Sequence, residues 1–398
     1  MPARNRPPAG KPAGKPAPPA RRPPPPPAPV VYHCRATIAA GLEAALKDEL
    51  DDLGLKCTAE EGAVVFDASD AQLRLVHLWS RLAGRISVVL GRFNAGTLEQ
   101  LGTGARRMPW ARFVHPHQPL DLHFAARGSH LRLKDAVLKK VEHAVTDALR
   151  GPRIGGGRPP RTPVGILIRA EDEKVEISVD ATGEPLHKRG WRQETAKAPL
   201  RENLAAAVLR LADWAPGEAL VDPMCGSGTF SIEAAGIALR QPPGARRTFA
   251  FETWPGHDAR AWAAEKAERS PALDLVAPIR GSDRDPGAIR ASRANAARAD
   301  VERRVAFDER SFADVVPPAE TGLIVMNPPY GERIERGSGL AGMRAVGDVL
   351  AARWKGWRFA ILLSDARLKS ALKVPTEELA SFSNGGIPVR LYAGIVPL

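Results

Sequence analysis

The stretch ALVDPMCGSGTFSIEAA, residues 219–235, carries the most information about the fold. It reads as a short apolar strand, a glycine-rich turn and a helix, and glycines at such a turn let the backbone approach a ligand closely. Gly226 and Gly228 match the first two positions of the dinucleotide motif GxGxxG, but Ser231 stands at the third. No Lys-Ser/Thr pair follows, so the stretch is not a phosphate-binding P-loop either.

The carboxylate of Asp222, at the end of this strand, narrows the choice of ligand. A negative charge there repels a pyrophosphate and favours a cation or a hydrogen-bond donor. S-adenosylmethionine offers both, in its amino group and its sulfonium. A tight strand–helix turn without any ligand is the alternative interpretation.

Strands and helices alternate outward from this stretch, from about residue 195 to the end of the sequence. Helical patterns separate most of the apolar runs PIRGSD, VAFDE, GLIVMN, RFAILLS and VRLYAGIV. This alternation predicts an α/β fold with a doubly wound, mostly parallel sheet.

The region before residue 195 has a different rhythm and reads as α+β. Strand patterns such as AVVFDA and RISVVLGRF alternate with amphipathic helices, and GILIRA with KVEISVDA predicts a hairpin with a charged turn.

A second acidic corner follows the strand PIRGSD. An acidic side chain at a strand tip can accept both ribose hydroxyls of a nucleoside, and Asp283 is the candidate. Asp285 reads as the cap of the following helix. The spacing from Gly228 to Asp283 far exceeds the usual ~20 residues. An insertion at about residues 240–275, rich in Trp, Pro and Arg, accounts for the difference.

The motif IVMNPPYGERI, residues 324–334, supplies a third polar corner. The first proline holds Asn327 extended, so that the Asn327 amide oxygen and the Pro328 carbonyl point one way. Tyr330 adds a flat face. Two acceptors beside a stacking platform suit a planar amine, such as the exocyclic NH2 of a base or an amide.

Accepting hydrogen bonds from both protons of such an amine frees its lone pair for a methyl group, without a metal or a strong base. A base within a helix must first be unstacked, and Tyr330 can hold it once flipped. An ordinary proline-rich turn with a packed tyrosine is the alternative.

Taken together, DPMCGSGT, GSDRD and NPPYGER resemble the donor, ribose and catalytic motifs of class I methyltransferases that act on amino groups. SVDATGEPLHKRGWRQETAKAPLRENLAAAVL resembles the junction of THUMP-domain RNA methyltransferases of the guanine-N2 type, which modify 23S ribosomal RNA. GSHLRLKDAVLKKVEHAV resembles their THUMP helices, and TIAAGLEAALKDELDDLG their ferredoxin-like segment. The resemblance covers about residues 31–398.

The resemblance implies a ferredoxin-like segment at 30–70, a THUMP RNA-binding domain at 71–182 and a Rossmann-like methyltransferase domain at 190–398. The cofactor it implies is S-adenosylmethionine, and no metal is expected. The implied catalytic residues are Asn327, Pro328, Pro329 and Tyr330. The implied cofactor-binding residues are Asp222, Pro223, Met224, Cys225, Gly226, Ser227, Gly228, Thr229, Asp283, Arg284 and Pro199, with Leu200 and Arg201 as weaker candidates.

The sequence departs from the class I pattern where many of these enzymes place an Asp against the adenine amine. Here DERSFAD puts Ser311 and Phe312 at that point and Asp314 slightly later. Some bacterial relatives carry a second methyltransferase domain for guanine N7, whereas this sequence is expected to have a single activity.

A net charge of +12 and a pI near 9.9 favour a polyanionic partner, nucleic acid first. Six basic residues and 13 prolines lie in residues 1–29, which read as a disordered tail. The longest apolar runs fall short of the ~18 residues that span a bilayer. No signal peptide and no paired cysteine pattern are evident, so a cytoplasmic protein without a membrane partner is expected.

Several alternatives remain open. The same chemistry could act on tRNA, because a THUMP surface reads RNA shape more than sequence. DNA amino-methyltransferases and protein-glutamine methyltransferases share the NPPY corner but need no RNA-gripping half. A non-catalytic RNA-binding ribosome-assembly factor with a decayed cofactor site is the alternative of another class, and the intact motif residues argue against it.

Overall fold

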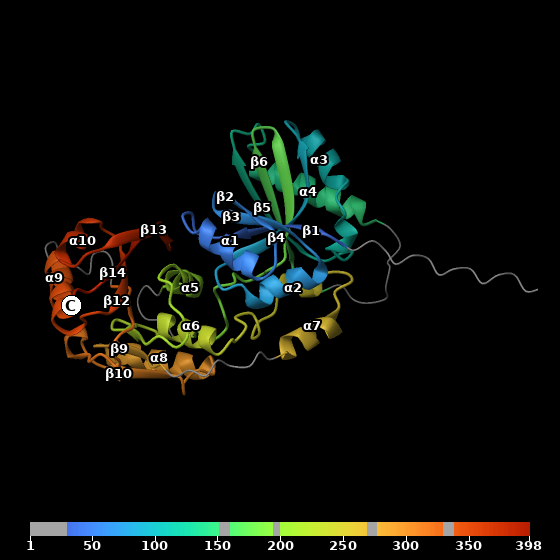
Figure 1. Ribbon diagram of the computed structural model, residues 1–398. Coiled ribbons are helices and arrows are strands. Elements are labelled where there is room, and N and C mark those ends of the chain that lie inside the picture. Colours follow the sequence, from blue (N-terminus) through green and yellow to red (C-terminus); the bar gives the residue numbers. More distant parts are fainter. Residues whose placement is uncertain (1–29, 151–159, 194–199, 269–276, 329–337) are drawn as a thin grey trace, which may run out of the picture. The chain divides into compact units, whose positions relative to one another are not determined.

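Two seven-stranded sheets organise the part of the chain that the structure describes (Figure 1). The computed structural model describes residues 30–150, 160–193, 200–268, 277–328 and 338–398. The predicted tail at 1–29 and three predicted site residues, Pro199, Pro329 and Tyr330, lie outside these ranges.

The first sheet has the strand order β2-β3-β1-β4-β7-β6-β5. Its strands are β1 (Tyr32–Thr37), β2 (Cys57–Glu60), β3 (Ala63–Ala68), β4 (Arg85–Asn94), β5 (Leu120–Arg127), β6 (Val164–Glu171) and β7 (Lys174–Asp180). Its helices are α1 (Glu43–Asp52), α2 (Asp70–Trp79), α3 (Leu98–Arg106) and α4 (Lys134–Ala148), with a 3-10 turn, η1, at Trp110–Arg112.

The first six elements of this sheet confirm the ferredoxin-like prediction. The chain order β1-α1-β2-β3-α2-β4, with the sheet order β2-β3-β1-β4, is the split βαβ arrangement of that fold. This arrangement spans residues 32–94. The ferredoxin-like segment that the resemblance implies ends earlier, at residue 70. Ser69 caps α2 through a capping box with Gln72.

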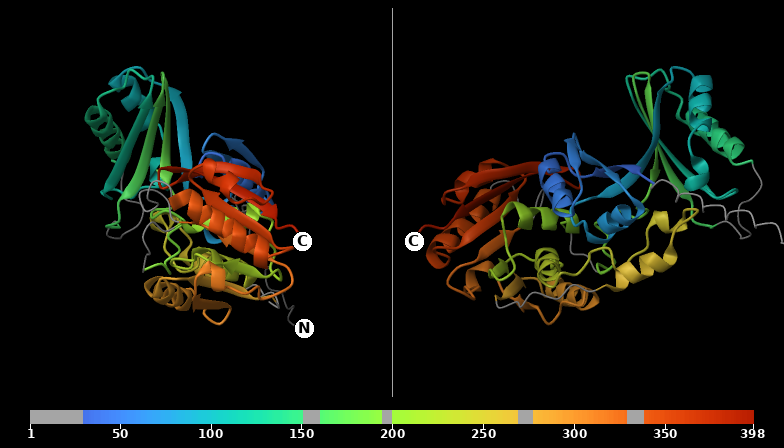
Figure 2. Two further views of the ribbon diagram at one scale, coloured as in Figure 1. Left: turned by 90° about the vertical axis from the view of Figure 1, so that its left-hand side faces the viewer. Right: turned by 45° about the vertical axis from the view of Figure 1, so that its right-hand side comes forward.

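The remaining strands continue the sheet from β4. The predicted hairpin is confirmed, since β6 and β7 are antiparallel and joined at Asp172, which takes a φ of +52°. β5 runs parallel to β6, and α3 and α4 lie side by side next to these strands (Figure 2). β2 and α3 were not predicted. The four residues CTAE of β2 are largely exposed and carry no apolar alternation, whereas the capping box between Thr97 and Gln100 is a signal that could have found α3.

The second sheet has the order β10-β9-β8-β11-β12-β14-β13. Its strands are β8 (Leu220–Asp222), β9 (Ile279–Asp283), β10 (Val305–Glu309), β11 (Leu323–Met326), β12 (Arg358–Leu363), β13 (Glu377–Asn384) and β14 (Ile387–Ile395). Its helices are α5 (Glu202–Leu211), α6 (Thr229–Ala238), α8 (Pro286–Arg298), α9 (Ser338–Arg353) and α10 (Arg367–Ala371), with a 3-10 turn, η3, at Phe312–Asp314.

Neighbouring strands from β10 to β12 are parallel, which confirms the predicted Rossmann-like sheet. At one edge of this mostly parallel sheet, β14 and β13 form an antiparallel hairpin against β12. The sequence indicated only the β14 strand, since β13 reads EELASFSN, which is mostly polar and exposed.

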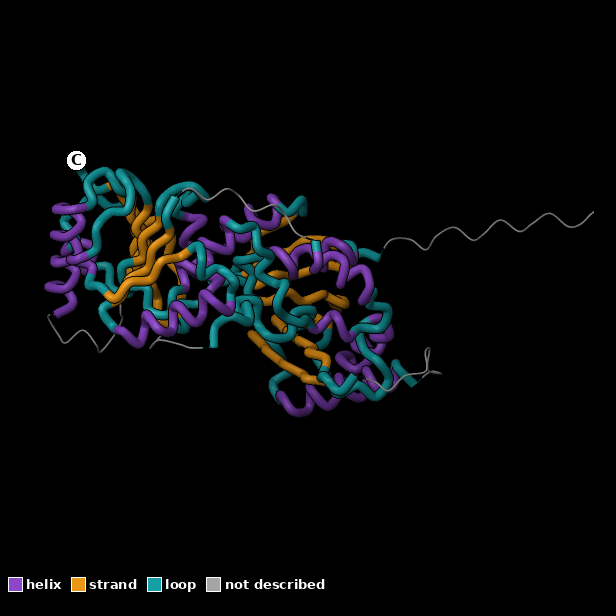
Figure 3. Tube along the Cα trace, turned by 90° about the horizontal axis from the view of Figure 1, so that it is seen from below, coloured by secondary structure: helices purple, strands orange, loops and turns teal. Residues whose placement is uncertain are grey.

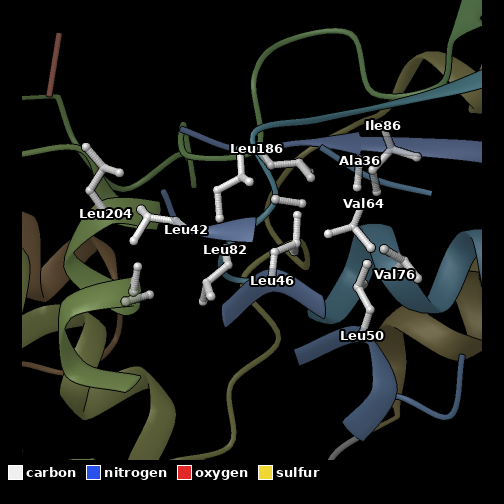
Figure 4. Packing of buried hydrophobic residues seen from close by; sticks show 14 of the residues in the cluster. Ala36, Leu42, Leu46, Leu50, Val64, Val76, Leu82, Ile86, Leu186 and Leu204 are labelled. Atoms are coloured by element: carbon white, nitrogen blue, oxygen red, sulfur yellow. The ribbon is translucent and has the colours of Figure 1, made fainter. Parts of the chain in front are cut away.

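The central strands β8, β11 and β12 are buried on both faces, as is typical of a parallel sheet, whereas β9 and β10, nearer one edge, expose Arg280 and Ala306. In β11, Leu323 and Val325 face one hydrophobic core, while Ile324 and Met326 face a second. The first core continues into the ferredoxin-like helices, where Leu46 of α1 and Leu204 of α5 belong to the same cluster (Figure 4). The tube trace shows the strands of the two sheets as separate groups (Figure 3).

The predicted insertion between Gly228 and Asp283 contains η2 (Ala250–Thr253) and α7 (Ala259–Ala267). It docks on the ferredoxin-like unit. The rings of Phe249 and Phe251 lie 5.1 and 4.9 Å from the ring of His77. Arg74 forms a bidentate ion pair with Glu265, with Nε–Oε2 and Nη2–Oε1 distances of 2.8 Å each. Within the described ranges, no helix combines the length and apolar composition that crossing a bilayer demands.

Candidate functional site

Three polar side chains follow or end three adjacent strands of the second sheet. Asp222 ends β8, Asp283 ends β9, and Asn327 directly follows β11. β8 pairs with both neighbours, with Asp222 opposite Gly281 and Val221 opposite Ile324. Parallel strands bring their carboxyl ends to one edge, so all three polar side chains lie at the same edge of the sheet.

This edge is also the point where the order of strands reverses. The chain builds β8, β9 and β10 outward in one direction and then returns to place β11 on the other side of β8. Ligands of open α/β sheets bind in the crevice that such a reversal opens at the carboxyl ends of the strands.

The loop between β8 and α6 needs its glycines. Gly226 and Gly228 have φ angles of +53° and +83°, which side chains disfavour. A Cβ added to Gly228 would lie 2.9 Å from Cζ of Phe307, so both conformation and space select glycine there. We call Asp222, residues 223–229 and Asp283 the glycine corner.

The Asp283 carboxylate holds this loop in place. Its Oδ2 accepts a hydrogen bond from the Gly226 N–H at 3.0 Å, and its Oδ1 accepts one from the Asp285 N–H at 3.0 Å. The prediction that Asp285 caps the next helix is confirmed, because its side chain accepts from the Gly287 N–H at 2.8 Å. Each Asp283 oxygen keeps a further lone pair for a ligand.

Two residues of α8 that the sequence motifs did not single out also fix the loop. Ser292 Oγ donates to the Gly226 carbonyl at 2.7 Å, and Asn295 Nδ2 donates to the Ser227 carbonyl at 3.2 Å. Both are fully buried. Their spacing of three residues on one helix face, within an alanine-rich helix, is the signal that could have found them.

Asp222 is a buried carboxylate without a cationic partner among the described residues. It is 2% exposed, and its Oδ1 accepts a hydrogen bond from the Met224 N–H at 3.4 Å. Burial raises the pKa of Asp222 well above its usual value, the nearby Asp283 carboxylate adds to the rise, and the Met224 N–H opposes it. Ser227 Oγ, also buried, has no hydrogen-bond partner within the described ranges. The Asp222 carboxylate and Ser227 Oγ therefore fit a ligand that carries a positive charge and hydrogen-bonding groups.

Arg192 joins the glycine corner to the preceding segment, and the sequence motifs did not identify it. Its Nη2 donates to the Leu200 carbonyl and to Thr229 Oγ1, both at 2.8 Å, and its Nε lies 3.0 Å from Glu202. The Leu200 side chain is buried, whereas Arg201 is exposed. Arg192 therefore fixes the start of α6 and of α5 relative to each other.

The other predicted site residues are placed as follows. Pro223, Cys225 and Pro328 are buried, Met224 and Asn327 are partly exposed, and Arg284 is exposed. In the stretch that departs from the class I pattern, Ser311 donates to Asp314 at 2.6 Å, and Phe312 is buried in the second core.

An open parallel sheet with a glycine-rich loop and acidic strand tips at its reversal point defines a Rossmann-like domain that binds a nucleoside-containing ligand. A family model described as "RMKL-like, methyltransferase domain" matches residues 189–392, and one described as "RlmL ferredoxin-like domain" matches residues 33–87. The chain belongs to the RMKL-like methyltransferase family.

Named relatives agree with this assignment. The chain is 37% identical over 375 residues to a ribosomal RNA large subunit methyltransferase K/L of Methylococcus capsulatus, which covers 90% of this chain and 50% of that protein. It is 33% identical over 366 residues to a Synechocystis protein provisionally named an RNA methyltransferase, covering 89% of this chain and 94% of that protein. The chain thus spans about half the length of the curated K/L relatives it matches.

Among solved structures, a methyltransferase named SMU.472, complexed with SAH, has a TM-score of 0.84 and 30% sequence identity. The similarity covers 92% of this chain and 99% of that chain. It therefore includes both sheets.

Proposed function

We propose that this protein transfers a methyl group from S-adenosylmethionine to the exocyclic N2 amine of a guanosine in 23S ribosomal RNA. The observation that carries the proposal is the meeting of Asp222, Asp283 and Asn327 at the carboxyl edge of three adjacent strands. The large-subunit ribosomal RNA named for the K/L relatives supports the choice of substrate, and the SAH named with the similar structure supports the donor.

On the donor side, the glycine corner receives the cofactor. The buried Asp222 carboxylate accepts the donor's ammonium group, and the loop residues 223–229 line its methionine end. Asp283 accepts the ribose hydroxyls while it keeps its bonds to Gly226 and Asp285. Arg284 and Pro199 complete the predicted donor-binding set. S-adenosylmethionine supplies an electrophilic methyl group on a sulfonium centre.

On the acceptor side, the Asn327 amide oxygen and the Pro328 carbonyl accept hydrogen bonds from the two N–H groups of the guanine amine. This favours a pyramidal nitrogen whose lone pair can attack the methyl carbon. Methyl transfer would form the new N–C bond as the S–CH3 bond breaks, and the displaced amine proton would pass to solvent. Pro329 and Tyr330 are proposed to complete this pocket and to stack the flipped base.

The remaining regions are proposed to serve the RNA. The ferredoxin-like segment (30–70) and the THUMP domain (71–182) would hold structured RNA, and the methyltransferase domain (190–398) would act on it. An RNA target of this kind places the reaction in the cytoplasm.

Nucleoside mass spectrometry tests this function. Purified protein and S-adenosylmethionine are incubated with unmodified 23S rRNA and, separately, with unmodified tRNA. We expect N2-methylguanosine in the 23S sample alone. The same product in tRNA alone would keep the chemistry and move the target, and donor binding without methylation of either RNA would favour the non-catalytic assembly factor or a different substrate.

A further inference from the structure

A cavity of about 990 Å³ opens beside the glycine corner. Three segments line it: residues 184–192, Arg201–Glu202 at the start of α5, and residues 245–248 together with Lys266 of the insertion. We call it the basic pocket. Arg192 lines it and also bonds to Thr229, so the basic pocket and the glycine corner share a wall.

The lining is strongly cationic. Seven lysine or arginine side chains line the basic pocket against two glutamates, an excess of five positive charges. One of the glutamates, Glu202, is itself buried, and burial raises its pKa. Crowded cations of this kind create a local potential that attracts polyanions.

Five of the seven cations pair with carboxylates: Lys188 with Glu184, Arg189 with Glu233, Arg192 with Glu202, Arg246 with Asp300 and Lys266 with Glu252. Arg247 is held differently, by neutral acceptors. Arg247 donates to the carbonyls of Pro185 at 2.6 Å and Lys188 at 3.0 Å, and it lies over the ring of Phe249 at 4.9 Å. Within the described ranges Arg247 has no ion pair, and the side chain of Arg201 has neither an ion pair nor a hydrogen bond. Because carbonyls position a guanidinium without cancelling its charge, these two arginines keep their full attraction for an anion.

The field inside the pocket is visible at His187, which lines it. The pKa of His187 is lowered to about 4, first by burial and then by the charges of Arg201, Arg189, Arg192 and Lys188. The pKa of Arg247 is lowered to about 10 by burial and then by its neighbour Arg189. For both groups, neighbouring cations add to the effect of burial on the pKa.

We propose that the basic pocket binds the phosphodiester backbone of the RNA strand, next to the guanosine whose amine is methylated at Asn327. The proposal rests on the proposed function and names where its substrate is held. Five of the seven cations are arginines, whose forked donors match phosphate oxygens better than lysine does. An RNA strand bound there would lie next to the proposed methyl-donor site. Holding the strand so close would help to keep the target base out of its stack.

The test reverses two exposed charges of the pocket, in the variant Lys188→Glu/Arg246→Glu. Lys188 pairs with the exposed Glu184 and Arg246 with the exposed Asp300, so little stability is lost. The matched control, Lys355→Glu/Arg303→Glu, changes charge equally at two exposed positions of the methyltransferase domain that do not line the pocket. A milder variant, Lys188→Gln/Arg246→Gln, is used if the charge reversal impairs folding, which thermal melting monitors.

Binding of an unmodified 23S rRNA fragment is measured by fluorescence anisotropy across a salt series, and donor binding by calorimetry. We expect the pocket variant to lose at least about tenfold in RNA affinity. Its slope of log K against log salt should fall by about 1.4, which corresponds to two phosphate contacts. The control should bind RNA within about threefold of wild type, and donor affinity should be unchanged in both.

Two results would overturn the proposal. One is RNA binding by the pocket variant that equals that of the control. The other is a parallel loss of donor affinity, which would make the pocket part of the donor site. Failure of the proposed function is separate, because wild-type protein that binds RNA through this pocket but forms no N2-methylguanosine would contradict the activity and leave the binding site standing.

Discussion

The glycine corner and the basic pocket share a wall but differ in charge and in burial. The corner contains two aspartates, one of which is 2% exposed, whereas the pocket is lined by an excess of five positive charges. We have proposed a methyl donor with an ammonium and a sulfonium for the first and a polyanion for the second. The difference teaches that two neighbouring sites can sort two ligands by charge alone, before shape is considered.

The residue between the two regions is expected to matter most for stability. Glu233 of α6 is 2% exposed and pairs with Arg81 at 3.1 Å and with Arg189, which lines the basic pocket, at 3.3 Å. Glu233→Gln leaves two buried cations without their carboxylate and should cost about 3–5 kcal/mol in the free energy of unfolding. Urea denaturation measures this.

The matched control is Glu184→Gln, because Glu184 is exposed and, among the residues that the structure describes, its ion pair is with the exposed Lys188. Its unfolding midpoint should stay close to that of wild type. Equal midpoints for the two variants would show that Glu233 does not hold the two regions together.

Asn327→Ala should break the chemistry while leaving both ligand sites intact. Loss of the amide acceptor removes a group that stabilises the reacting amine, so kcat should fall by at least about 100-fold. Donor affinity, measured by calorimetry, and RNA affinity should remain within about twofold of wild type. A variant that keeps its activity would end the role assigned to Asn327.

Asp283→Ala should weaken the glycine corner and spare the basic pocket. The substitution removes the acceptor for the proposed ribose hydroxyls and also for Gly226 N–H, so donor affinity should fall about tenfold or more. Asp283→Asn keeps one acceptor oxygen and should lose less. Unchanged donor affinity in both variants would remove Asp283 from the donor site, and RNA affinity serves as the internal control.

The smallest expected effect is a proton released on donor binding. The pKa of Asp222 is raised in the free protein, and the donor's ammonium group should lower it, because a nearby cation favours the ionised form. Binding then releases part of a proton, and donor affinity rises with pH, by about tenfold per pH unit at most.

Calorimetry in two buffers of different ionisation heat counts this proton. Asp222→Asn, which cannot ionise, should abolish the buffer dependence while the RNA salt slope stays the same. A buffer dependence that survives the substitution would assign the proton to another group.

The local elements of this protein follow from its sequence. The strand–glycine–helix order at residues 219–235, the Asp285 cap and the β6–β7 hairpin depend on residues two to a few positions apart, and all were predicted correctly. β13 and β2 were missed because their partners, rather than any apolar alternation of their own, make them strands.

What only the tertiary structure decided are contacts between distant segments. Arg192 reaches Thr229 across 37 positions, Arg247 reaches Pro185 across 62, and Arg74 reaches Glu265 across 191. A single sequence records which charges exist but not which of them meet, because that depends on how the insertion docks on the ferredoxin-like unit. The motifs of the glycine corner were therefore readable in advance, whereas the basic pocket exists only where three separate segments of the chain come together.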